Sequence, residues 1–144
     1  MSRAGAVARI DTLLSSITDP TFKAVYFGDP KSIKTTPMVA FWVQSHDVDF
    51  ETLGDVSTTT TMLIRAYFPV ISSDDVTETI EQDLWDSIVN IRTKLRGDSN
   101  LNGEVTDTEI GSATTGFVEM QGNIYRHVSI PYEIDIYGEY PITP

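Results

Sequence analysis

A long amphipathic helix is the feature that most restricts how this chain can fold. Apolar residues recur at steps of four and three between residues 74 and 96, at Val76, Ile80, Leu84, Ile88, Ile91 and Leu95. This spacing places them in one stripe of an α-helix, and Trp85 and Val89 widen the stripe. Basic residues fill the last turn and Gly97 follows, which is typical of a helix C-terminus. Such a helix must bury its stripe against another layer.

The rest of the chain supplies short strands and one further helix. Val7, Ile10, Leu13, Leu14 and Ile17 predict a helix over residues 4–17. We expect strands at 24–27, 38–43, 58–68, 105–110, 117–121 and 124–137, with an edge, bulge or bend at Pro131. The order is therefore α-β-β-β-α-β-β-β. It predicts a single α+β domain over 1–144, with a mostly antiparallel sheet, both helices on one face and a flexible tail at 138–144. Phe41 or Trp42 and several tyrosines are expected on the other face.

The second and third strands form a projecting β-hairpin in this prediction. Its base, Met38–Val43, is apolar, whereas its tip between His46 and Ser57 is acidic. About twelve residues is long for a hairpin loop, and loops of that length are usually functional or disordered. The tip holds Asp47, Asp49, Glu51 and Asp55, and the four residues Thr58, Thr59, Thr60 and Thr61 follow it. Threonines favour an extended strand that can pair with the edge of a neighbouring subunit.

Charge is unevenly distributed along the chain. The sequence has 10 Lys and Arg against 21 Asp and Glu, a formal net charge of -11, which argues against a basic nucleic-acid-binding surface. Acidic residues lie mostly after residue 34. One interpretation is a solvated acidic face. The other is that copies of the protein meet through opposite charges, with the hairpin tip contacting a basic N-terminal segment that contains Arg3, Arg9, Lys23, Lys31 and Lys34.

Motifs for catalysis and metal binding are missing from the sequence. There is no cysteine, and the two histidines, His46 and His127, are far apart. The acidic tip fails the EF-hand pattern, because threonine stands where that loop needs its glycine and its last glutamate. No nucleophile motif or phosphate-binding glycine loop is found. We therefore expect a protein that is not an enzyme and that has no cofactor, no metal, no membrane segment and no signal peptide.

The order of elements resembles that of the tail terminator, or tail-completion, proteins and related neck proteins of long-tailed bacteriophages. The likeness covers nearly the whole chain and is carried by the segments at 10–14 (IDTLL), 26–30 (YFGDP), 37–43 (PMVAFWV), 83–88 (DLWDSI) and 130–135 (IPYEID). The resemblance implies a structural virion protein that forms a ring, typically a hexamer. Such a ring caps the tail tube, receives the head–tail connector and lets viral DNA pass without binding it specifically.

Two classes of function follow from the sequence. The first is this virion ring, either as a tail terminator or as another neck or head-completion protein. The second is a small non-enzymatic binding adaptor in the bacterial cytoplasm. The first predicts a ring-sized particle, and the second predicts a monomer or a dimer.

Overall fold

The long helix forms as its spacing predicts. The computed structural model describes residues 2–50, 56–70 and 74–137, so the predicted tail at 138–144 lies outside the described residues. Helix α2 spans Asp74–Arg96 and ends where the Gly97 N–H donates to the Thr93 carbonyl. Leu84, Ile91 and Leu95 are buried. Ile88, predicted to be buried with them, is only partly buried.

The first helix, α1, spans Arg3–Ser15, close to the predicted 4–17. The Ser2 hydroxyl caps it by accepting a hydrogen bond from the Gly5 N–H at 2.9 Å. The Ser2 N–H in turn donates to the Glu104 carboxylate at 2.9 Å, which ties the start of α1 to the segment after α2. A Cβ at position 5 would overlap the Glu104 carboxylate, so a larger residue there would displace this side chain from the start of α1.

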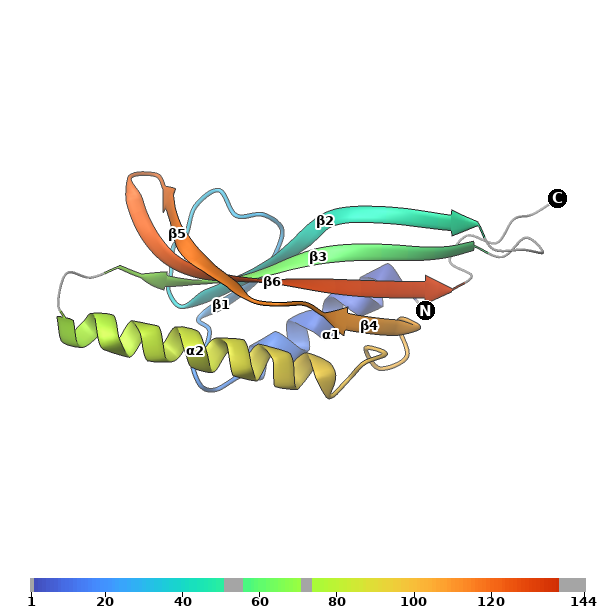
Figure 1. Cartoon of the computed structure of the whole chain (residues 1–144), viewed down its shortest axis with the longest axis horizontal. Coiled ribbons are helices and arrows are strands. Elements are labelled where there is room, and N and C mark those ends of the chain that lie inside the picture. The colour runs from blue at the N-terminus through green and yellow to red at the C-terminus, as the bar shows by residue number, and fades with distance from the viewer. Residues whose placement is uncertain (1, 51–55, 71–73, 138–144) are drawn as a thin grey trace.

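Six strands form one sheet, and its order is β1-β2-β3-β6-β4 with β5 paired to β6 (Figure 1). Every pair is antiparallel except β1 with β2. The α+β fold and its element order are therefore confirmed. The strand bounds are Ala24–Phe27 (β1), Met38–Phe50 (β2), Val56–Pro69 (β3), Asp107–Ile110 (β4), Thr114–Met120 (β5) and Asn123–Tyr137 (β6).

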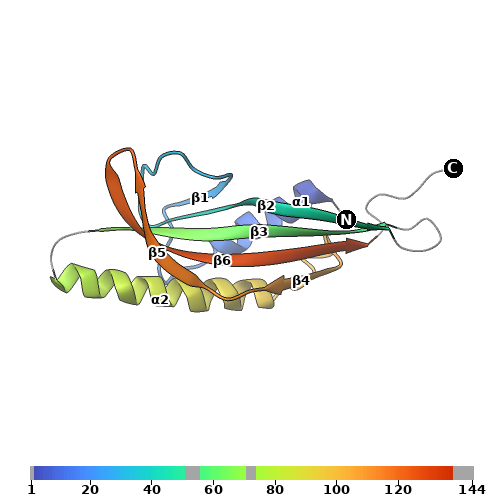
Figure 2. The same cartoon turned by 45° about the horizontal axis from the view of Figure 1, so that its top comes forward.

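Both helices cover the same face of the sheet, as predicted (Figure 2). The main core lies between them and the sheet, and it contains Phe41, Phe68 and Ile130. We call the opposite side the open face. A smaller core on this face gathers Met38, Ala40 and Tyr67 beneath the loop 28–37 and the β5–β6 hairpin. Phe41 thus belongs to the helix face, and Trp42 to the open face.

The long hairpin differs from its prediction in one respect. Residues 46–50 and 56–57, expected in a loop, continue β2 and β3 as a paired ladder. The register of β2 shifts between Val43 and Ser45, which leaves Gln44 as the extra residue of a β-bulge. Before the bulge Val43 faces the helix side, and after it His46 does, opposite Thr60. Asp47 therefore faces the open side.

Strand β6 runs unbroken through Pro131, because the proline lies at a gap between two ladders. On one side β6 pairs with β3 along its whole length. On the other side it pairs with β5 as far as Ser129 and with β4 from Tyr132. The Pro131 carbonyl accepts from the Gly111 N–H at 2.8 Å on that second side. The missing N–H of the proline therefore costs β6 no bond to β3.

Candidate assembly surfaces

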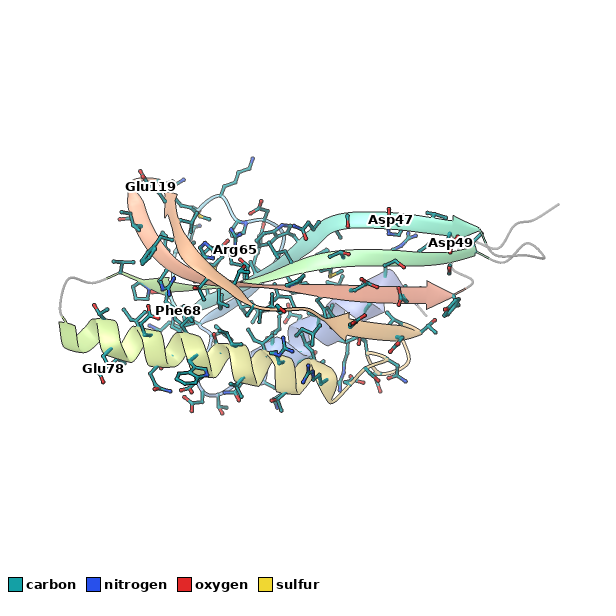
Figure 3. All side chains as sticks on the ribbon, viewed as in Figure 1. Asp47, Asp49, Arg65, Phe68, Glu78 and Glu119 are labelled. Atoms are coloured by element: carbon teal, nitrogen blue, oxygen red, sulfur yellow. The ribbon has the colours of Figure 1, made fainter. Side chains whose placement is uncertain are left out.

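Carboxylates gather on the open face at one end of the sheet, where residues 45–50 of β2 pair with residues 56–61 of β3. We call this end the far end of the sheet. Asp47 lies opposite Thr59, Thr59 lies opposite Asp135, and Asp135 lies opposite Asp107, so four strands contribute to one row. The Thr59 hydroxyl donates to Asp135 Oδ1 at 2.8 Å. Figure 3 shows Asp47 and Asp49 near the end of β2.

A second row repeats the pattern one step along the strands. Thr61 lies opposite Glu133, which lies opposite Glu109. Directly opposed like charges destabilise a sheet, and here two such pairs join β4 to β6. No lysine or arginine belongs to the described stretches 45–50, 56–61, 107–110 and 132–137. We call this surface the acid face, and its residues are Asp47, Asp49, Asp107, Glu109, Glu133 and Asp135.

The predicted arm residues divide between the two sides of the sheet. Asp47 and Asp49 lie on the acid face, and Thr59 and Thr61 lie there with them. Thr58 and Thr60 face the helix side, and Thr58 is buried. Because β3 pairs with both β2 and β6, its threonines present no free edge, and strand addition at residues 58–61 is excluded. Glu51 and Asp55 lie outside the described residues.

The predicted basic residues do not form one surface. Arg9 Nε pairs with Asp98 Oδ2 at 2.5 Å inside the chain, and this hydrogen bond holds the pKa of Asp98 below its usual value. Arg3 lies beside an apolar groove under α1. Lys31 and Lys34 lie on the loop 28–37, over the open face, and Lys23 precedes β1.

The apolar groove has a volume of about 620 Å³ and lies between the start of α1 and the helix face of the far sheet. Its walls are Ala6 and Val7 of α1 with apolar side chains of β2, β3 and β6, including Val43 and Ile134. His46 reaches its rim, where its Nδ1 lies 2.7 Å from Thr60 Oγ1.

Two side chains that the sequence placed in the apolar stripe of the long helix, Trp85 and Val89, lie on the surface of α2. Trp85 is 66% exposed and Val89 is 51% exposed. Phe117 of β5 is 65% exposed and packs under the Arg126 guanidinium, whose carbon lies 4.9 Å from the ring centroid. Arg126 also pairs with Glu81 at 2.8 Å, which links β6 to α2. We call Glu78, Glu81, Trp85 and Val89 with Phe117 the α2 ridge. Sequence reasoning missed this surface, because Trp85 lies next to the buried stripe and shares its hydrophobicity.

A serine and a histidine lie close together on the open face. Ser129 Oγ lies 3.4 Å from His127 Nδ1 and accepts from Arg65 Nε at 2.8 Å. Burial lowers the pKa of His127, and the charges of Arg65 and Arg126 lower it further. The third group of this cluster is thus an arginine bound to the serine, and not a carboxylate that orients the histidine as in a hydrolytic triad.

Three other carboxylates approach one another beneath α2. Asp19, Asp83 and Asp86 place one oxygen each within 4.8 Å of the others. Burial, and the charges of the other two, raise the pKa of Asp83. This group could not be predicted from the sequence, because Asp19 is far from α2 along the chain. Among the described helices, none is both long and apolar enough to cross a membrane.

Comparisons with known proteins add a likeness of shape. No family model matches the sequence, and no curated protein matches it. A chain of a solved structure titled "Virion of native gene transfer agent (GTA) particle" is similar with a TM-score of 0.46. The two chains are 10% identical, and the match covers 94% of this chain and 93% of that one.

Proposed function

We propose that this chain is a structural protein of a virus particle, a tail terminator that forms a ring, typically of six copies, at the end of a phage tail tube. The acid face carries this proposal. It is an ordered surface on four strands, it includes two pairs of directly opposed like charges, and the fold buries none of it against the helices. Like-charge repulsion on this face destabilises the monomer, and a role for the face in the assembled particle gives a reason for its presence.

A ring with the acid face turned inward forms a negatively charged channel. Phosphate groups of DNA are repelled by such a wall, so the polyanion passes without being held. The threonine hydroxyls of β3, including Thr59 and Thr61, separate the charges of β2 from those of β6 and keep the wall hydrated. The acid face thus suits a passage for DNA rather than a binding site for it.

The proposed partners follow from this placement. The ring lies in the virion, between the tail tube protein on one side and the head–tail connector on the other. Its role is positional, and we propose no catalysis and no cofactor.

The mass of the particle tests the proposal directly. A hexamer of the 16.0 kDa chain has a mass of about 96 kDa, which light scattering measures, and negative-stain images of it should show a central hole. A monomer or a dimer at all concentrations would instead support the cytoplasmic adaptor.

Charge reversal inside the channel tests the role of the acid face. Asp47→Lys with Asp49→Lys should leave the ring intact and slow DNA exit from particles of the virus that encodes the chain. Glu119→Lys on β5 is the control, because Glu119 lies outside the acid face opposite Ile124. Normal DNA release from the double variant would contradict the proposal.

A further inference from the structure

Two surfaces of opposite charge lie on opposite sides of the sheet. The α2 ridge belongs to the helix layer, and Figure 3 shows Glu78 pointing away from the sheet. Residues 77–91 of α2 contain four acids and no lysine or arginine. The loop 28–37 lies on the other side, where Ile33 joins the small core of the open face and its carbonyl accepts from the Tyr125 hydroxyl at 3.4 Å.

That loop forms a groove of about 520 Å³ with β1. We call it the lysine groove, and it is lined by Tyr26, Asp29, Lys31, Lys34 and Met38 among others. Lys31 and Lys34 are exposed and make no ion pair with the described residues. Tyr26 is 51% exposed, so the groove offers an aromatic side chain beside its two positive charges.

The α2 ridge has the composition of a protein-binding surface. Tryptophan and arginine are enriched among residues that dominate binding energy, and the exposed Trp85 lies beside Arg126. The ridge is also held in place before binding. Arg126 bonds Glu81, stacks on Phe117 and donates to the Gly116 carbonyl at 3.1 Å. A pre-ordered surface loses less entropy when a partner binds.

We propose that the α2 ridge of one copy docks in the lysine groove of a second copy, with Trp85 as the apolar anchor and Glu78 facing the lysines. The charges are complementary, since acidic residues flank Trp85 on the ridge, whereas Lys31 and Lys34 flank the groove. The sheet separates the two surfaces, so a chain cannot satisfy its own ridge with its own groove. The contact is therefore head-to-tail, and repeating it closes a ring or extends a filament. This docking would be the contact between subunits in the ring of the proposed function. It depends on the proposed function only for the closing of the oligomer into a ring.

Two variants, each broken on one surface, test the docking. The ridge variant is Glu78→Lys with Trp85→Ala, and the groove variant is Lys31→Glu with Lys34→Glu. Each should be a monomer by light scattering, since each has lost one half of every contact. Their equimolar mixture should give a 1:1 dimer and nothing larger, because only one intact ridge and one intact groove remain to meet. Tyr137→Ala removes an exposed aromatic side chain at the far end of the sheet and should assemble like the wild type.

The results separate this inference from the proposed function. Assembly of either broken variant at wild-type strength would overturn the docking while leaving a ring possible. A mixture that stays monomeric, or a wild type that is monomeric at high concentration, would also overturn it. If the ridge variant loses the oligomer but virus particles that carry it are still complete, the docking is upheld and the terminator function is overturned. Salt should weaken the contact, because rim charges are screened within about 8–10 Å at physiological ionic strength.

Discussion

Removing the carboxylates of β4 should make the protein more stable. The double variant Asp107→Asn, Glu109→Gln keeps side-chain shape and removes both directly opposed like-charge pairs with Asp135 and Glu133. Opposite Cβ atoms in an antiparallel pair are about 5 Å apart, so the charges lie about 6 Å apart. Two unit charges at that distance in water repel by about 0.7 kcal/mol. The two pairs together therefore cost about 1.4 kcal/mol.

Thermal unfolding followed by circular dichroism measures this gain. For a domain of this size about 1.4 kcal/mol corresponds to a rise in Tm of about 3–6 °C. The salt dependence of the gain shows whether its origin is electrostatic, because the Debye length falls from about 30 Å at 0.01 M salt to about 3 Å at 1 M. The gain should be largest at low salt and should mostly disappear at 1 M. Glu119→Gln, a carboxylate opposite Ile124, is the control and should change Tm little. An unchanged Tm at low salt, or a gain that persists at 1 M, would refute the electrostatic reasoning.

Three further predictions concern the core and the titrating groups. Ile91→Ala should cost about 2–5 kcal/mol in urea unfolding because Ile91 is fully buried, and the partly buried Ile88 should cost less; equal costs would contradict the packing described. Asp98→Asn should lower the free energy of unfolding by about 1 kcal/mol at pH 7. Because Arg9 lowers the pKa of Asp98, the difference from wild type should shrink as the pH falls below about 4, which urea denaturation at pH 7 and pH 3 would test. Because the pKa of His127 is lowered in the folded protein, the unfolded chain binds more protons, and stability should fall as the pH drops below about 6.5. His127→Gln should reduce that loss. An NMR titration midpoint of the His127 imidazole at or above about 6.5 would contradict this prediction.

Periodicity was sufficient to predict the elements and their layering, because burial of one stripe per helix leaves few arrangements of this element order. It was not sufficient for Trp85. That residue follows Leu84 by one position, about 100° around the helix, and only the width of the opposing sheet decides whether it is covered. The far end of the hairpin was predicted as a loop because its composition is polar. It forms strands because β6 pairs along the full length of β3 and satisfies its backbone.

The surfaces depend on contacts that join distant parts of the chain. The acid face exists because β4 and β6, which are separated along the chain by β5, pair with each other and lie across β3 from the carboxylates of β2. The sequence showed an acidic segment but not its neighbours. The same holds for Arg9, which looked free in a basic segment and is instead paired with Asp98.

The bulge at Gln44 also determines how this chain must be compared with other chains. Side chains alternate along a strand, so if Gln44 paired in a regular ladder, Asp47 would move to the groove side. Because Gln44 is the extra residue of the bulge, deleting it would restore a regular ladder and leave Asp47 on the acid face. An ungapped alignment with a protein whose corresponding strand has no bulge would therefore equate acid-face positions of this chain with groove-side positions of the other. Residue similarity along β2 is informative only after a gap for the bulge has been placed.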